Sequence, residues 1–322
     1  MYHTRRRFMT VAAGLGASAL QPALAQSQVS EPKPAPVGSG SFRDAGKKAA
    51  PFSVRSADGT LLTGDAQSDP AASEVLFIHG LRQSRLSWAK QFSDPGLANL
   101  RMVCFDLRGH GDSDKPAALD AYADAGRWAD DVAAVISAAK LRRPVLVGWS
   151  LGGYVAGAYL RRHGGSAIAG VNLVAAVSRL APDWFTPLVG DFARTTTSPD
   201  LETRVTAKAA LLAACFHQTP TDAEFQEMLV VNGMTPRAVY EGFLGTATTD
   251  LEPVFAAYAG PILLTHGTHD RLVRIEMAER IRSLKPGSQL SVFADSGHSP
   301  FHEEPARFGR ELAAFVSAAN RA

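Results

Sequence analysis

Ser150 lies in the segment PVLVGWSLGGYVAGAYLRRHG, residues 144–164, with one glycine two positions before it and another two positions after it. A residue on a tight turn between a strand and a helix leaves no room for side chains at those positions, and Gly148 and Gly152 meet that demand. Such a turn would hold the Ser150 hydroxyl out at a helix N-terminus, where it could act as a nucleophile. The alternative is a serine that only caps a glycine-rich helix.

A serine nucleophile needs a general base, and the base needs an acid that orients it. Asp270 and His298 are the candidates, because each follows closely on an apolar run, as Ser150 does. If these runs are parallel strands of one sheet, their carboxyl ends share one edge and the three side chains can meet there.

Other residues compete for these roles or suggest a different kind of site. His302 is a rival base, but it opens the final helix in FHEEP, where a surface or capping role is expected. Asp295 is a rival acid, but it stands only three residues before His298 on the same loop. His266 and His269 flank a turn and have no cysteine or carboxylate-rich partners, so we interpret them as structural and predict no metal site.

The elements that would position these residues are short apolar strands that alternate with amphipathic helices. Six apolar runs lead into Gly, Asp, Ser or His: EVLFIHG, RMVCFDLRGHG, RPVLVGWS, IAGVNLVAAV, GPILLTHGTHD and SQLSVFADSGH. Helical stretches such as AGRWADDVAAVISAAK and IEMAERIRSLK lie between most of them. This alternation predicts an α/β fold, with a mostly parallel central sheet covered by helices on both faces.

Two further segments precede or interrupt this alternation. The stretch FSVRSADGTLLTGDA, which begins at residue 52, alternates around Asp58-Gly59 and predicts an antiparallel hairpin. The interval of about 178–260 is rich in aromatic residues and helical stretches, and it predicts a helical cap that forms an apolar pocket over the carboxyl edge. Most of these aromatic residues are individually expected to fill the core of the cap itself.

Together these features resemble the α/β-hydrolase superfamily, from about residue 52 to residue 322. The turn at Ser150 is similar to the nucleophile elbow of that superfamily, and Asp270 and His298 follow in its order of serine, acid and histidine. The resemblance implies acyl transfer, in which Ser150 attacks a carbonyl carbon, His298 takes and returns the proton, and Asp270 steadies the imidazolium. Water then releases the acyl group, and no cofactor is implied.

The resemblance also assigns the backbone donors that would stabilise the oxyanion. The N–H of Leu151, immediately after the serine, is one of them. The other is the N–H of Leu81, because His79-Gly80 resembles the HG turn of the family. Gly80 is therefore a candidate loop glycine of the site.

The segment FDLRGHGDSDKP resembles another landmark of the family, the turn after the next strand. We interpret Asp106, Arg108, His110 and Ser113 as scaffold residues that brace the loops through hydrogen bonds and an ion pair. A direct substrate contact from this turn is less favoured.

The type of residue at the nucleophile position limits which activities of the superfamily are expected. Haloalkane dehalogenases and epoxide hydrolases carry an aspartate where Ser150 stands, so those activities are disfavoured. Carboxylesterases, enol-lactonases, carbon–carbon bond hydrolases and cofactor-free haloperoxidases or perhydrolases are left, and we expect a carboxylesterase-like enzyme (EC 3.1.1) acting on a small apolar ester or lactone. The alternative is a small-molecule receptor or binding module on the same fold, without sustained turnover.

The charge composition of the chain argues against nucleic acid and anionic lipid as partners. The chain has 322 residues with 33 Lys and Arg against 31 Asp and Glu, so no excess of positive charge exists to bind nucleic acid or anionic lipid. Cys104 lies in an apolar run, far from Cys215 in the sequence. We expect two free, buried thiols, with a disulfide formed after export as the alternative.

The first 25 residues have the anatomy of an export signal. Three arginines at positions 5–7 precede a mildly apolar stretch too short to span a bilayer, and small residues end it at Ala25. The run TRRRFM resembles a twin-arginine signal, and the alternative is an ordinary Sec signal or a basic arm. Residues 26–51, rich in Pro, Gly and charge, predict a flexible linker. We therefore expect the export machinery as a partner of the precursor, and a periplasmic or secreted mature protein with no stable membrane anchor.

Overall fold

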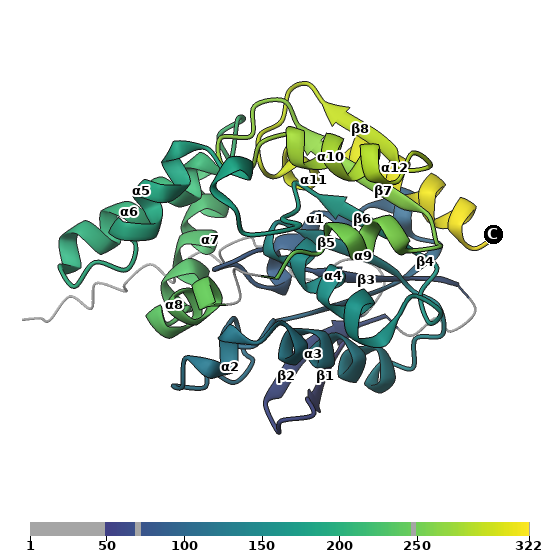
Figure 1. Ribbon diagram of the computed structural model, residues 1–322, viewed down its shortest axis with the longest axis horizontal. Coiled ribbons are helices and arrows are strands. Elements are labelled where there is room, and N and C mark those ends of the chain that lie inside the picture. The colour runs from purple at the N-terminus through teal and green to yellow at the C-terminus, as the bar shows by residue number, and fades with distance from the viewer. Residues whose placement is uncertain (1–48, 68–71, 246–248, 322) are drawn as a thin grey trace, which may run out of the picture. The chain divides into compact units, whose positions relative to one another are not determined.

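Within residues 49–67, 72–245 and 249–321, which the computed structural model describes, eight strands form a single sheet. Their order across the sheet is β1 (Ala50–Arg55), β2 (Leu61–Ala66), β4 (Leu100–Phe105), β3 (Ser73–Ile78), β5 (Val145–Trp149), β6 (Gly170–Val174), β7 (Ile262–Gly267) and β8 (Gln289–Phe293). β2 pairs antiparallel with β1 and with β4, and the other neighbouring pairs are parallel. The predicted α/β fold with a mostly parallel sheet is confirmed (Figure 1).

The first two strands form a hairpin at one edge of the sheet, as predicted. Their turn contains Gly59 at φ 87°, a conformation that favours glycine. β1 begins at Ala50, two residues before the predicted domain start at residue 52. Pro51 fits there because β1 is an edge strand, where a residue without an N–H can face away from the ladder.

Two apolar cores lie on opposite faces of the sheet, because alternate residues of a strand point to opposite sides. In β3, Leu76 and Ile78 belong to one core, whereas Val75 and Phe77 belong to the other. The first core is covered by α3 (Ala125–Ala138), α4 (Leu151–His163), α9 (Glu252–Ala257) and α10 (Glu276–Leu284). The second is covered by η1 (Arg85–Trp88), α1 (Ala89–Phe92), η2 (Pro95–Leu97), α11 (Pro300–Glu303) and α12 (Pro305–Ala319).

The helices form where apolar residues recur at helical spacing, and α3 illustrates this. Trp128, Val132 and Val135 lie on its buried face. Asp124 caps its first turn, since its carboxylate accepts the N–H of Gly126 at 2.7 Å. Burial of this stripe, at about 25 cal/mol per Å² of apolar surface removed from water, holds the helix on the sheet.

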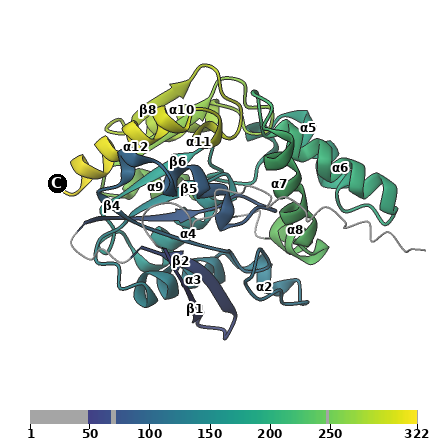
Figure 2. The same cartoon turned by 180° about the vertical axis from the view of Figure 1, so that it is seen from behind.

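Helices between β6 and β7 project from one side of the sheet, at left in Figure 1 and at right in Figure 2. They are η3 (Pro182–Trp184), α5 (Pro187–Thr195), α6 (Leu201–Ala214), α7 (Asp222–Met234) and α8 (Arg237–Gly245), and we call them the cap. α8 packs on the short α2 (Asp120–Ala123), which follows β4. α9, which falls within the predicted cap range of about 178–260, packs against α4 and α10.

No helix within the described ranges is long and apolar enough to cross a membrane. The predicted export signal, residues 1–25, and residues 26–48 of the predicted linker lie outside those ranges. Cys104 and Cys215 are both buried and free, as expected.

Candidate active site

Ser150 lies between β5 and α4 in a strained backbone conformation. Its φ of 53° and ψ of −115° are rare for a residue with a side chain and cost on the order of 1–3 kcal/mol. Its N–H donates to the carbonyl of Val174 at 2.9 Å, and its carbonyl accepts from Gly153 at 3.0 Å and Val177 at 3.1 Å. Its side chain makes no capping hydrogen bond to α4, which removes the main reason to regard it as a simple helix cap.

The glycines near Ser150 lie where backbone or side-chain atoms of neighbouring elements come too close for a Cβ. A Cβ on Gly148 would lie 2.5 Å from the carbonyl oxygen of Gly152, and a Cβ on Gly152 would collide with the carbonyl oxygen of Ile78. A Cβ on Gly80 would lie 3.3 Å from the Cβ of Ser150. The glycine spacing in the sequence thus reflects the close approach of β3, β5 and α4.

The structure brings Asp270 and His298 together from the loops after β7 and β8. His298 Nδ1 lies 2.8 Å from Asp270 Oδ2, and the two side chains are 3% and 2% exposed. The other carboxylate oxygen, Oδ1, accepts the N–H groups of Leu272 at 2.8 Å and Val273 at 3.0 Å. These bonds fix the carboxylate, and the carboxylate in turn fixes the imidazole.

A second histidine faces the same carboxylate. His266 Nε2 lies 3.3 Å from Asp270 Oδ2 and 3.0 Å from the carbonyl oxygen of Val273. Burial alone would raise the pKa of Asp270, but interactions with His298 and His266 hold the pKa of that carboxyl well below its usual range. This contact of His266 is not predicted from the sequence, where His266 reads as a structural residue, although the two residues stand four positions apart at one turn.

Trp149, the residue before Ser150, connects β5 to the loop of His298. Its indole N–H donates to the backbone carbonyl of His298 at 2.8 Å, and the two rings lie 5.7 Å apart between centroids. Its ring also packs on Phe301 at 5.0 Å. This role of Trp149 is not predicted from the sequence, because the glycine-flanked motif carries no signal about a partner so far along the chain.

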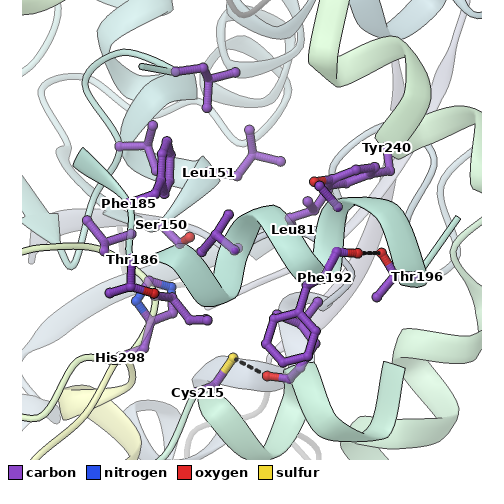
Figure 3. Close-up of a pocket in the computed structure, with 18 of the residues that line it drawn as sticks. Leu81, Ser150, Leu151, Phe185, Thr186, Phe192, Thr196, Cys215, Tyr240 and His298 are labelled. Carbon is purple, nitrogen blue, oxygen red and sulfur yellow. Dashed lines mark hydrogen bonds between the residues drawn. The ribbon is translucent and has the colours of Figure 1, made fainter. Parts of the chain in front are cut away.

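Ser150 and His298 both line a cavity of about 550 Å³, whose walls also include residues of the cap (Figure 3). Phe185, Phe192 and Phe243 are among the apolar side chains that line it. The predicted apolar pocket is therefore present.

The alternative candidates from the sequence lie elsewhere in the structure or contact other residues. The ring of His302 faces the side chain of Lys90 at 3.5 Å and Glu224 at 3.6 Å. The ring of His269 stacks on that of His217, with 3.7 Å between centroids. Asp295 is not among the described residues that line the cavity. Among the residues that the structure describes, no group of three or more metal-ligating side chains comes together.

Leu81 and Leu151, the two predicted oxyanion donors, both line the cavity. Leu151 is the first residue of α4, where N–H groups lack acceptors within the helix. Within the described part of the chain, neither backbone N–H donates a hydrogen bond. Both groups are thus available to a ligand.

Two buried histidines hold the loop after β3. His79 Nε2 accepts the N–H of Leu107 at 3.0 Å, and its Nδ1 lies 2.7 Å from the carbonyl oxygen of Gly80. His110 Nε2 accepts the N–H of Arg82 at 3.0 Å. Burial lowers the pKa of His79 to about 4 and the pKa of His110 to about 3, so both rings are neutral at pH 7.

Asp106, Arg108 and Ser113 brace the loop after β4, as the sequence analysis proposed. Arg108 donates to both carboxylate oxygens of Asp131 at 2.7 Å, and both side chains are fully buried. Ser113 donates to the backbone carbonyl of Asp106 at 2.6 Å, and the Asp106 carboxylate pairs with Arg85. None of these side chains is among the described residues that line the cavity.

Comparison with known proteins identifies the family. A family model described as the alpha/beta hydrolase fold matches residues 74–305. The chain belongs to this alpha/beta hydrolase family. The hydrolase is 29% identical to the AB hydrolase superfamily protein YisY of Bacillus subtilis (strain 168) over 251 residues, which cover 75% of this chain and 90% of that protein. It is 26% identical to the bifunctional esterase/perhydrolase DCH of Acinetobacter calcoaceticus over 264 residues, 75% of this chain and 91% of that protein.

Solved structures of esterases resemble the hydrolase. A candidate aryl esterase from Burkholderia cenocepacia is 39% identical with a TM-score of 0.81, and the match covers 85% of this chain and 100% of that chain. The esterase RhEst1 from Rhodococcus sp. ECU1013 is 28% identical with a TM-score of 0.72, and the match covers 84% and 99%. These likenesses indicate an enzyme of the alpha/beta hydrolase kind with esterase-like relatives.

The neutral histidines predict that the hydrolase loses stability as the pH falls from 7 to 5. In the unfolded chain both histidines have a pKa near 6.5 and take up protons, whereas His79 and His110 stay neutral in the folded protein. Each histidine therefore lowers the free energy of unfolding by about 2 kcal/mol between pH 7 and pH 5. His110→Gln keeps an acceptor for the N–H of Arg82 but does not titrate. The variant should therefore lose about 2 kcal/mol less than the wild type, measured by denaturant unfolding at pH 7, 6 and 5. An identical pH dependence in both proteins would contradict this account.

Proposed function

We propose that the protein is a serine hydrolase that cleaves a carboxylic ester or lactone of a small apolar substrate (EC 3.1.1). One observation carries this proposal: the strained Ser150 and the imidazole of the Asp270–His298 pair, which come from three different strand ends, line the same apolar cavity. A serine in that setting has the base and the orienting acid that nucleophilic catalysis requires.

In the proposed reaction the Ser150 hydroxyl oxygen attacks the carbonyl carbon of the substrate. His298 takes the hydroxyl proton as general base and returns it to the leaving oxygen. Asp270, which contacts Nδ1 of His298, leaves Nε2 as the nitrogen that moves the proton, and it stabilises the imidazolium. Water then attacks the acyl-enzyme with the same proton transfers, which releases the acid and restores Ser150.

The backbone N–H groups of Leu81 and Leu151 are the proposed donors to the oxyanion. Each such donor is typically worth about 3–4 kcal/mol in the barrier. The N-terminus of α4, where Leu151 lies, adds a positive end of a helix dipole. His79 and His110 would position Leu81, because they bond to the residues on either side of it.

The cavity supports a small, mainly apolar substrate. Its volume of about 550 Å³ suits a small molecule, and most of its lining side chains are aliphatic or aromatic. The names of the relatives, which include esterases and an esterase/perhydrolase, further support ester cleavage for this chain.

Export of the hydrolase by the twin-arginine route to the periplasm or beyond is part of this proposal. The support lies in the arginines at positions 5–7, the short apolar stretch after them, and the small residues that end at Ala25. The free thiols of Cys104 and Cys215, both buried, fit a chain that folds in a reducing compartment before export.

Ser150→Ala should abolish hydrolysis of short- and medium-chain 4-nitrophenyl esters, because it removes the nucleophile. We expect kcat/KM to fall by at least about 10⁴-fold. A fluorophosphonate probe should label the wild type and not the variant. A wild type that hydrolyses no ester or lactone and is not labelled would instead favour a binding module.

Asp270→Asn should lower kcat by about 10³- to 10⁴-fold, because the amide cannot hold His298 in the tautomer that accepts a proton on Nε2. Asp295→Asn is the matched control, since this second acid lies near His298 in sequence but does not contact its ring. The control should keep kcat within about threefold, as surface substitutions usually do. An equal loss in both variants would remove Asp270 from its proposed role.

Replacement of Arg5 and Arg6 by lysine should stop export of a reporter fused to residues 1–25, because the twin-arginine machinery reads that pair. The measurement is the distribution of the reporter between cytoplasm and periplasm, with the unaltered signal as control. Unchanged export would remove the twin-arginine assignment and leave a Sec signal.

A further inference from the structure

Three polar side chains line the cavity without a hydrogen-bond partner. They belong to Gln83, Asn232 and Tyr240, and each residue is less than 9% exposed. Asn232 Oδ1 is a buried acceptor with no partner in the described part of the chain. The amide of Gln83 and the hydroxyl of Tyr240 also form no hydrogen bond with the described residues. Buried polar groups in proteins are normally hydrogen-bonded, so three unpaired ones in a single wall call for a partner from outside the chain.

Other polar side chains in the lining have partners within the protein. The hydroxyl of Thr196 donates to the backbone carbonyl of Phe192, and the thiol of Cys215 donates to that of Leu211 at 3.4 Å (Figure 3). These two groups need nothing from a ligand. The contrast singles out Gln83, Asn232 and Tyr240 as the polar lining whose hydrogen bonds are left open.

Gln83 and Tyr240 both adjoin the turn that follows β3. The N–H of Gln83 donates to the carbonyl of Gly80 at 3.3 Å, and a Cβ on Gly80 would lie 3.3 Å from the Cβ of Ser150. Arg82, in the same turn, places its Cζ 4.8 Å from the centroid of the Tyr240 ring. In Figure 3, Tyr240 lies to the right and Ser150 to the left. A ligand group held at this turn would therefore lie a few bonds from a carbonyl that Ser150 attacks.

The group that fits this wall is uncharged. Burial raises the pKa of Tyr240, so its phenol is neutral at pH 7 and its O–H can donate. No Asp or Glu is among the described residues that line the cavity. Arg274 does line it, but this residue is exposed and its Nε donates to the carbonyl of Phe185 at 3.0 Å. A charge beside the two amides and the phenol would be buried without an opposite charge, which is costly.

A buried polar group without a partner is costly, and a ligand that pairs with it offsets that cost. We propose that Gln83, Asn232 and Tyr240 bind a neutral carboxamide or hydroxyl of the substrate, a few bonds from the ester carbonyl. The amide oxygens of Gln83 and Asn232 accept the N–H or O–H of that group, and the Gln83 amide N–H and the Tyr240 hydroxyl donate to its oxygen. This inference rests on the proposed function, because the same cavity holds Ser150.

The test compares esters of equal chain length that differ only in this group. N-acetyl-β-alanine methyl ester, methyl 5-oxohexanoate and methyl hexanoate probe the acyl arm, with the amide complete, without its N–H, and without either polar group. The compounds 2-acetamidoethyl acetate, 4-oxopentyl acetate and pentyl acetate probe the alcohol arm in the same way. Methyl 5-hydroxyhexanoate and 4-hydroxypentyl acetate distinguish a hydroxyl from an amide.

Acid release by the wild-type chain is followed at constant pH, and each kcat/KM is divided by the rate constant for alkaline hydrolysis of the same ester. In one arm we expect the amide or the hydroxyl ester to exceed its hydrocarbon analogue by about tenfold to a hundredfold. The ketone should fall between them, because it accepts a hydrogen bond but leaves the acceptors of the wall unpaired.

Variants then locate the origin of this preference. Tyr240→Phe removes only the hydroxyl, and Gln83→Met keeps the length of the side chain without its amide. Each should lower the ratio of polar to hydrocarbon kcat/KM by about fivefold or more. Thr196→Val is the matched control, because this lining hydroxyl already donates to the carbonyl of Phe192, and it should keep the ratio within about twofold. Each ratio is measured within one protein, so it does not depend on the fraction that folds.

The outcomes separate this inference from the proposed function. Hydrolysis that depends on Ser150, with no preference for an amide or hydroxyl in either arm, overturns the polar subsite and leaves the esterase proposal intact. A preference that persists in both variants, or falls equally in Thr196→Val, also overturns it. So does a higher kcat/KM for monomethyl adipate than for the neutral polar esters, which would point to Arg274. Failure of the wild type to hydrolyse any of these esters or 4-nitrophenyl esters overturns both proposals.

Discussion

The strained backbone of Ser150 is the constraint on which the rest of the site depends. A serine at φ 53° remains there because Val174 accepts its N–H and because Gly153 and Val177 donate to its carbonyl. α4 packs so closely on β3 and β5 that no space is left for a Cβ at Gly148. This close packing holds the three hydrogen-bond partners of Ser150 in position. The same contacts bring the loop after β3 beside the N-terminus of α4. Leu81 and Leu151, whose N–H groups donate no hydrogen bond within the described residues, line one cavity there. The buried sheet supplies the packing that offsets the strain.

Burial acts on the charges around this turn in three different ways. His79 and His110 are neutral because burial disfavours their protonation, and neutrality lets each accept a backbone N–H that holds a loop. Asp270 is ionised although it is buried, because two histidines and two backbone N–H groups surround its carboxylate. Arg108 is buried with a bidentate carboxylate partner and serves the scaffold. Arg82 pairs with no carboxylate among the described residues, and its Cζ lies 4.8 Å from the centroid of the Tyr240 ring.

Local patterns were enough to predict much of the fold. The strands after the hairpin follow the apolar runs, and α3 and α10 follow the helical stretches to within a few residues, because periodicity depends on neighbours along the chain. The sequence pattern of a short helix such as α9 does not tell whether the helix packs on a cap or on α4, which it contacts in the fold. The start of β1 was missed because an edge strand accepts Ala50 and Pro51, which carry no strand signal.

The sequence by itself determined that a serine stands on a glycine-flanked turn and that an aspartate and a histidine follow on later strand ends. Tertiary structure alone decided which side chains touch: that His298 rather than His302 contacts Asp270, that Trp149 bonds to the loop of His298, and that Arg82 lies over the ring of Tyr240. The physical reason is that a motif is encoded by residues adjacent in the chain. A contact between distant segments depends on the order of the strands in the sheet and on where the cap packs. The sequence pattern of one segment does not tell where the other segment lies.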